Sequence, residues 1–187
     1  MCRYVQGKFR ELYRASIGAD FLTKELLVDD TIVYLQVWDT AGQDRFETLG
    51  RVFYRGTDVC ILVYDITNPR SLERLEQWKR VYEESMPTQA DVDHTVFGVF
   101  ANKTDLEEQR KVSHAKAEAW CRENGDMPHF SVSAKDGENV EQAFHALAKK
   151  AKRKLDIWNQ QQLAEDRIHL RDVHMEKDGE QPCQLSC

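Results

Sequence analysis

The fold class of this chain is decided by the stretch Val96-Phe97-Gly98-Val99-Phe100-Ala101-Asn102-Lys103-Thr104-Asp105. Its first six residues form a short, continuous apolar run rich in β-branched and aromatic side chains, as is typical of a strand covered on both faces. A second run of this kind, VCILVY, occupies residues 59–64. We therefore expect both runs to be strands of a parallel sheet.

Helical patterns lie between and after these runs. Asn68 and Pro69 form a capping and first-turn pair, and Ser113 is placed to cap a second helix. A third helix is predicted to start near Asn139. The residues expected to face inward from these helices are Leu72, Leu75, Trp78, Tyr82, Ala117, Trp120, Cys121, Val140, Ala143, Phe144, Leu147, Ala151, Leu155 and Trp158.

Three further segments complete the pattern. Residues 129–132 predict a short strand, and residues 21–28 and 31–38, which flank Asp29-Asp30, predict an antiparallel hairpin. Strands that alternate with helices imply an α/β fold class, a mostly parallel sheet with helices on both faces.

Length and charge predict one domain and a tail. The chain has 187 residues, which fits one globular domain. Its net charge of −6 does not indicate a nucleic-acid-binding surface. No apolar run approaches the roughly 18 residues of a membrane span, and residues 1–10 lack the apolar core of a signal peptide. We expect a cytosolic domain over residues 1–160 and a flexible, mostly acidic tail over residues 161–187.

The five cysteines, Cys2, Cys60, Cys121, Cys183 and Cys187, are odd in number and scattered. A reduced state is therefore favoured over a disulfide framework. Cys60 and Cys121 lie in apolar segments and are expected to be small core residues.

The motif Asp39-Thr40-Ala41-Gly42-Gln43 directly follows a predicted strand. This places Asp39 at the carboxyl end of the sheet, where open α/β folds bind ligands. In a phosphate site, Asp39 would hold magnesium through water, Gly42 would offer an amide to a terminal phosphate, and Gln43 would orient the attacking water. Taken alone, Asp-x-x-Gly is also a common turn.

Asn102-Lys103-Thr104-Asp105 and Ser133-Ala134-Lys135 follow two other predicted strands. The Asp105 carboxylate can accept hydrogen bonds from N1 and the exocyclic amine of guanine, which adenine could not donate. The alternative for the first motif is an exposed turn closed by Asn and Asp, and the second consists of ordinary loop residues. The order and spacing of all three motifs make the set specific.

The sequence contains no phosphate-binding G-x-x-x-x-G-K-[ST] ahead of these motifs. That loop would supply the backbone amides, the lysine and the magnesium-binding hydroxyl that hold a nucleotide's phosphates. We therefore expect this chain to bind GTP and magnesium far more weakly than a protein that has the loop.

With these motifs the chain resembles the Ras superfamily of small GTPases and, within it, the Rab proteins. The resemblance rests on Trp38 to Phe46 (WDTAGQDRF) and Phe53-Tyr54-Arg55-Gly56. The segment IGADFLTKE at residues 17–25 is most similar to the late-endosomal and lysosomal Rab-seven type. The resemblance covers almost all of residues 1–160 and implies a P-loop GTPase-type fold and a guanine nucleotide cycle.

The resemblance also implies roles for individual residues. Ser16 stands where the family usually has a magnesium-binding threonine, Asp39 would be the second metal-side group, and Gln43 would be the catalytic residue. GTP or GDP and Mg²⁺ are the implied ligands. The implied nucleotide-binding residues are Ser16, Asp39, Gly42, Asn102, Lys103, Asp105, Ser133, Ala134 and Lys135.

Phe21, Trp38 and Phe53 match the aromatic triad through which Rab proteins meet effectors. Hydrophobic core between the sheet and the second switch is an equal alternative for these three side chains. The further partners implied by the resemblance are an exchange factor, an activating protein, an escort protein and a GDP-dissociation inhibitor. It implies a monomer in the cytosol and on the cytoplasmic face of late endosomes and lysosomes.

Two departures from the family pattern concern the ends of the sequence. The family has a first strand and phosphate loop ahead of the segment matched by residues 1–5, so we expect Met1 to be an internal methionine and the chain to be an incomplete gene model, a fragment or an alternative product. That strand lies between those ending at Trp38 and beginning at Val59. Its absence should break the central ladder, at a cost that a domain with ~5–15 kcal/mol of stability would struggle to absorb.

The second departure is the spacing of the last two cysteines. Cys183 and Cys187 are separated by Gln184-Leu185-Ser186, whereas Rab proteins usually end in nearly adjacent prenylated cysteines, and no CaaX box is present. Two terminal cysteines on a polar tail still favour dual lipidation and membrane attachment over a packing role.

Two functions from different classes follow. The leading hypothesis is a Rab-type GTPase, a switch in vesicle traffic to late endosomes and lysosomes. The alternative is a nucleotide-free pseudo-GTPase or interaction module that retains the effector surface.

Overall fold

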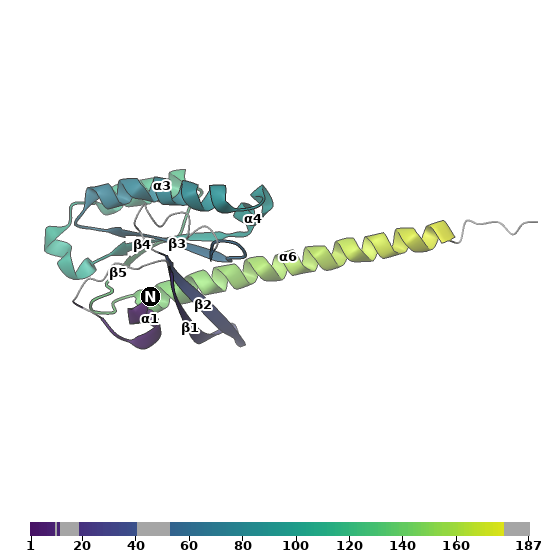
Figure 1. Cartoon of the computed structure of the whole chain (residues 1–187), viewed down its shortest axis with the longest axis horizontal. Helices are drawn as coiled ribbons and strands as arrows, with labels where there is room; N and C mark the ends of the chain where they lie inside the picture. The colour runs from purple at the N-terminus through teal and green to yellow at the C-terminus, as the bar shows by residue number, and fades with distance from the viewer. Residues whose placement is uncertain (10, 12–18, 41–52, 178–187) are drawn as a thin grey trace, which may run out of the picture. The chain divides into compact units, whose positions relative to one another are not determined.

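The computed structural model describes residues 1–9, 11, 19–40 and 53–177, with side chains as far as residue 160. Two compact units divide the chain, Met1–Ala151 and Lys152–Cys187. Within the described residues, no helix is both long and apolar enough to cross a membrane. The elements of the chain, labelled in Figure 1, are α1 (Cys2–Gln6), β1 (Ala19–Val28), β2 (Thr31–Thr40), β3 (Val59–Asp65), α3 (Pro69–Ser85), α4 (Gln89–His94), β4 (Val96–Asn102), η3 (Thr104–Gln109), α5 (His114–Glu123), β5 (His129–Val132) and α6 (Val140–Lys177).

The predicted parallel strands are confirmed. β3, β4 and β5 form a three-stranded sheet in that order, and both pairings are parallel. Val59 pairs with Val96 at the start of the β3–β4 ladder, and Asp65 pairs with Asn102 at its end. The polar residues that close β3 and β4 therefore emerge at one edge of the sheet.

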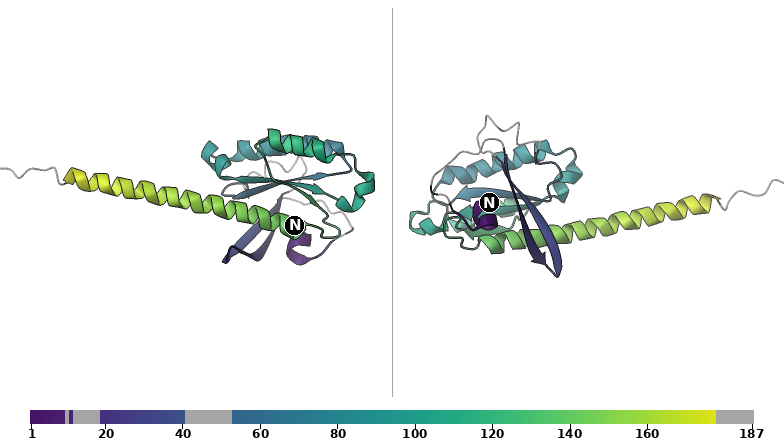
Figure 2. Two further views of the ribbon diagram at one scale, coloured as in Figure 1. Left: turned by 180° about the vertical axis from the view of Figure 1, so that it is seen from behind. Right: turned by 60° about the horizontal axis from the view of Figure 1, so that its bottom comes forward.

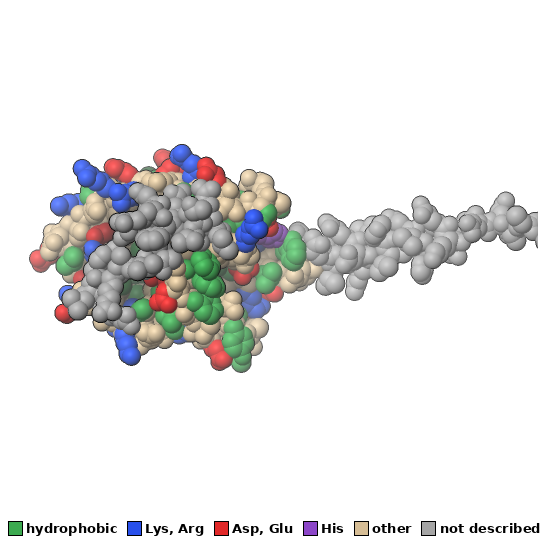
Figure 3. All heavy atoms as spheres, viewed as in Figure 1, with side chains coloured by type: hydrophobic (Ala, Val, Ile, Leu, Met, Phe, Trp, Pro, Cys, Tyr) green, Lys and Arg blue, Asp and Glu red, His purple; other side chains and the backbone are tan. Residues whose placement is uncertain are grey.

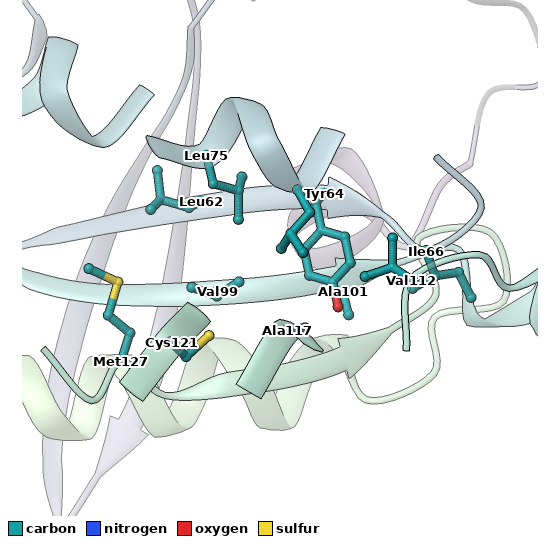
Figure 4. Packing of buried hydrophobic residues seen from close by; sticks show 11 residues of the cluster. Leu62, Tyr64, Ile66, Leu75, Val99, Ala101, Val112, Ala117, Cys121 and Met127 are labelled. Atoms are coloured by element: carbon teal, nitrogen blue, oxygen red, sulfur yellow. The ribbon is translucent and has the colours of Figure 1, made fainter. Parts of the chain in front are cut away.

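Helices cover both faces of this sheet, as predicted (Figures 1 and 2). On one face, Val99 and Ala101 of β4 pack with Leu75 of α3 and Ala117 of α5, in the cluster shown in Figure 4. On the other face, Val96 and Phe100 of β4 pack with the first turns of α6. Because side chains alternate along β4, the strand contributes residues to the hydrophobic cores on both faces of the sheet.

The predicted hairpin is also confirmed. β1 and β2 pair antiparallel from Ala19↔Thr40 to Val28↔Thr31. The two connecting residues, Asp29 and Asp30, have φ angles of 44° and 61°. Left-handed conformations at both central positions are those of the tight turn that matches strand twist, and aspartate tolerates them better than most residues do.

The helix starts follow the predicted capping signals. The Asn68 side chain accepts a hydrogen bond from the Arg70 amide, and Pro69 opens α3. The Ser113 side chain accepts one from the Lys116 amide at the start of α5. These contacts satisfy amides that have no partner within a helix.

The predicted break in the ladder is present in the described part of the chain. The hairpin and the parallel sheet are separate sheets, and a cavity of about 560 Å³ is lined by residues 35–40 of β2 and 59–63 of β3. Leu35 and Val59 nevertheless pack against the same hydrophobic cluster. Side-chain packing and polar contacts such as the Lys24–Glu141 and Lys149–Asp29 ion pairs, without strand pairing, therefore join the hairpin to the rest of its unit.

The end of the last helix differs from prediction. The sequence pattern fades near residue 160, but α6 continues as a helix to Lys177. Neither glycine nor proline occurs between Asn139 and Lys177 to stop it. Leu155 and Trp158, predicted as core residues, are 45% and 38% exposed. The placement of the domain boundary at residue 160 stays a prediction.

The close approach of β4 to α6 gives a first test. A Cβ atom at Gly98 would lie 2.6 Å from both methyl carbons of Leu147, which is itself buried. Gly98→Ala should destabilise the protein by about 1–3 kcal/mol, because an added methyl overpacks the core. Leu147→Val should partly relieve the clash, so urea unfolding of the two single variants and the double variant should show a non-additive cycle. Additive effects would show that this contact does not limit packing.

Candidate functional site

The site lies where β4 and β5 end. Asn102, the last residue of β4, pairs with Val132, the last residue of β5. The segments that follow carry the two predicted motifs, residues 102–105 and 133–135. The parallel pairing therefore brings together side chains that are about thirty positions apart, at the edge where open α/β sheets bind ligands.

Three hydrogen bonds join these two loops. The Ala134 amide donates to Asn102 Oδ1 at 3.0 Å, and Ser133 Oγ donates to Asp105 Oδ1 at 2.7 Å. Thr104 Oγ1 donates to a carboxylate oxygen of Glu138 at 2.9 Å. Ser133 is fully buried, so its bond to Asp105 orients that carboxylate from within the protein. The exposed-turn alternative does not account for these cross-loop contacts.

The second loop is also held by its own backbone. The Gly137 amide donates to the Ser133 carbonyl at 2.8 Å, and the Ser133 amide donates to the Glu138 carbonyl at 3.1 Å. Gly137 adopts a φ of 86°, which glycine tolerates without strain. This closed turn presents Ala134 and Lys135 beside the end of β4.

Lys103 is held in a defined position. Its backbone is left-handed, with φ at 74°, and its ammonium group lies 2.6 Å from Asp65 Oδ2 at the end of β3. Burial acts to raise the pKa of Asp65, but hydrogen bonds from Lys103 and Thr67 outweigh it and hold that pKa below its usual value. The sequence motifs predict Lys103 but do not reveal its partner Asp65.

Arg3 is a contributor that the motifs miss. It lies in α1, and its Nε donates to the Ala134 carbonyl at 2.8 Å. One terminal nitrogen donates to the Lys135 carbonyl and the other donates to the Gly7 carbonyl. A contact across 131 positions leaves no local signal in the sequence.

Of the residues predicted to contact phosphate or magnesium, Asp39 is the one that falls among the described residues. Partial burial and, to a lesser extent, the neighbouring Asp20 raise the pKa of Asp39, while the Met1 amino group opposes this. The described residues contain no group of three acidic, histidine or cysteine side chains that could hold a metal. A single carboxylate does not make a magnesium site. Ser16, Gly42 and Gln43 lie outside the described residues, as do Cys183 and Cys187.

The three aromatic residues Phe21, Trp38 and Phe53 lie close together. The ring centroids of Phe21 and Trp38 are 4.5 Å apart, and those of Trp38 and Phe53 are 4.8 Å apart. Phe21 and Trp38 are each 40% exposed, which argues against a purely core role. Figure 3 shows hydrophobic side chains gathered over β1 and β2.

Comparison with known proteins establishes the family. The model of the family described as "Ras family" matches residues 1–153. Ras-related protein Rab-7a of Paramecium octaurelia is 49% identical over 152 residues, 81% of this chain and 73% of that protein. Ypt/Rab-type GTPase ypt7 of Schizosaccharomyces pombe is 46% identical over 179 residues, 95% of this chain and 86% of that protein. Ras-related protein Rab7 of Drosophila melanogaster is 48% identical over 152 residues, 81% of this chain and 72% of that protein.

The chain therefore belongs to the Ras family. Within it, the chain is a Rab-type small GTPase of the Rab7 type. The predicted resemblance is confirmed, and the alternative of a nucleotide-free pseudo-GTPase or interaction module that retains the effector surface is not favoured.

The Asp65–Lys103 pair predicts a pH dependence. Because the pKa of Asp65 is lower in the folded protein than its usual value of 3.8, its contribution to stability is present above about pH 4 and is lost as the pH falls through the folded value. Asp65→Asn should lower the free energy of unfolding at pH 7 by up to about 1 kcal/mol. The two proteins should converge at strongly acidic pH, as followed by urea unfolding. Glu73→Gln, on the exposed side of α3, is the control, and an equal deficit at every pH would contradict the assignment.

Proposed function

We propose that the loops after β4 and β5 recognise the base of a guanine nucleotide. The observation that carries the proposal is the buried Ser133 hydroxyl, which orients Asp105. A carboxylate can accept hydrogen bonds from both N1–H and the 2-amino group of guanine, but adenine has no donor at either place. Asn102 and Ala134, already bonded to each other, form the adjoining edge, and Lys103 and Lys135 flank it.

On this proposal, base recognition contributes most of the nucleotide affinity of the chain as given. The sequence has no phosphate-binding motif, so the amides and the lysine that hold phosphates in other members are not supplied by it. In a form that has this motif, GTP or GDP would bind with Mg²⁺ near Ser16 and Asp39, and Gln43 would orient the attacking water.

The cellular role proposed here is a switch in vesicle and protein transport at late endosomes and lysosomes. Its support is the similarity to proteins named Rab7 and ypt7. Phe21, Trp38 and Phe53 form the proposed effector surface, since they are clustered and two of them are well exposed. An exchange factor, an activating protein, an escort protein and a GDP-dissociation inhibitor are the further proposed partners.

Base recognition can be tested without phosphate binding. Guanosine monophosphate should bind at least about tenfold more tightly than inosine monophosphate, which lacks the 2-amino group, because a hydrogen bond to a charged acceptor is worth ~1.5–3 kcal/mol. Asp105→Asn should abolish this preference, since the new amide nitrogen is a donor that faces the 2-amino group. Titrations followed by NMR chemical shifts give both dissociation constants at millimolar ligand.

Glu108→Gln, an exposed change of the same kind on η3, is the matched control and should keep the preference. Equal binding of the two nucleotides by the unmodified chain would overturn the proposal. Retention of the preference in Asp105→Asn would overturn the role of that carboxylate.

Membrane attachment by prenyl groups on Cys183 and Cys187 is proposed from the sequence. One lipid chain gives only marginal binding, and the tail has no basic cluster to assist it. Cys183→Ser or Cys187→Ser should therefore release most of the protein from membranes of cells expressing it. Fractionation, with mass spectrometry of the terminal peptide, provides the measurement. If neither thiol carries a prenyl group, or if both variants stay bound, the lipid anchor is wrong.

A further inference from the structure

The Arg3 guanidinium donates hydrogen bonds to three backbone carbonyl groups. It donates to the Ala134 carbonyl at 2.8 Å, to the Lys135 carbonyl, and to the Gly7 carbonyl at 2.8 Å. The stem of the same side chain packs over Gly137, where a Cβ atom would lie 3.4 Å from Arg3 Cδ. One side chain thus spans the first and last parts of the loop over residues 134–137.

The backbone amides of the same loop face the opposite way from its carbonyls, toward Asn102 at the end of β4 and toward Ser133. While the Ala134 and Lys135 carbonyls accept from Arg3, the Ala134 amide donates to Asn102 and the Asp136 amide donates to Ser133 Oγ. Ser133 Oγ in turn donates to Asp105. The chain of contacts from Arg3 therefore ends at the two side chains proposed to meet the base.

α1 is anchored independently of this loop, which makes it a fixed support. Tyr4 is buried and stacks on Phe144, with ring centroids 3.9 Å apart. Lys24 donates to the Tyr4 carbonyl at 3.0 Å and pairs with Glu141. Although α1 is short, Arg3 can hold the loop over residues 134–137 because the adjacent residue, Tyr4, packs in the hydrophobic core.

We propose that Arg3 is a positioning residue for guanine recognition, which holds the loop over residues 134–137 so that Ser133 orients Asp105. The inference rests on the proposed recognition of guanine by that loop. A planar guanidinium can bond two neighbouring carbonyl groups at once, whereas a lysine ammonium is a single point charge on a flexible stem. Arg3 is therefore not interchangeable with lysine at this position.

The first arm of the test is amide hydrogen exchange without nucleotide. In Arg3→Ala, the amides of residues 134–136 should exchange about tenfold faster than in the unmodified chain, because the loop opens more often when its carbonyls lose charged donors. Arg3→Lys should fall between the two. Arg74→Ala, an exposed arginine on α3, should change nothing in this loop. Unchanged exchange in both Arg3 variants overturns the proposal, whatever the protein binds.

The second arm is the preference for guanosine over inosine monophosphate. Arg3→Ala should reduce this ratio about tenfold, and Arg3→Ala with Asp105→Asn should reduce it no further than Asp105→Asn alone, since both changes act through one carboxylate. The role of Arg3 in specificity is overturned if Arg3→Ala speeds amide exchange but leaves the nucleotide preference unchanged. It is also overturned if the losses of preference in Arg3→Ala and Asp105→Asn add in the double variant.

The two proposals fail in different ways. If the unmodified chain shows no preference between the nucleotides, the proposed function fails, and the exchange data still decide whether Arg3 holds the loop. Arg3→Lys keeps the side-chain stem and its packing over Gly137, so it serves where Arg3→Ala does not fold.

Discussion

Burial of β4 on both faces is the constraint on which the rest of the structure depends. Val99 and Ala101 are fully buried on one face, and Val96 and Phe100 are nearly so on the other. A slip of one residue would exchange the two sets of side chains, so the register against β3 and β5 is strongly specified. Gly98 allows α6 to approach closely, because any larger residue would meet Leu147.

The register of β4 against β3 and β5 determines the geometry of the candidate site. With β4 held in place, Asn102 must end opposite Val132, and the loops that follow must leave the sheet side by side. Hydrogen bonds between the loops then set the side chains in detail, from Ser133 to Asp105 and from Ala134 to Asn102. The positions of polar groups at the site thus follow from apolar packing about one strand.

The features that the sequence predicts correctly are those with local causes. Continuous apolar runs predict β3 and β4, Asp29-Asp30 predicts the hairpin turn, and Asn68 with Pro69 predicts the start of α3. The full length of α6 is missed because its apolar stripe fades while its backbone meets no glycine or proline to end it. Helices α1, α4 and η3 are too short to give a periodic pattern.

The sequence predicts the motif residues of the site but not the residues that hold them in position. Asn102, Asp105 and Ser133 stand in recognisable order, but the partners Asp65 and Arg3 are distant in sequence and carry no motif. Such contacts arise only after folding has brought separate segments together. Ser16 and Gln43 lie outside the described residues, so their roles remain predictions from the sequence.

Base recognition and phosphate binding are physically separable in this architecture. The described base-side contacts come from residues 102–105 and 133–138 with support from Arg3, whereas the missing motif would serve only the phosphates. Two hydrogen bonds to a carboxylate contribute ~1.5–3 kcal/mol each, while association costs several kcal/mol of translational and rotational freedom. Under the proposed recognition of guanine, the base half alone would therefore bind weakly but selectively, whereas tight binding requires the phosphate half. For this reason a mononucleotide distinguishes a chain that still selects its base from one that has lost nucleotide recognition altogether.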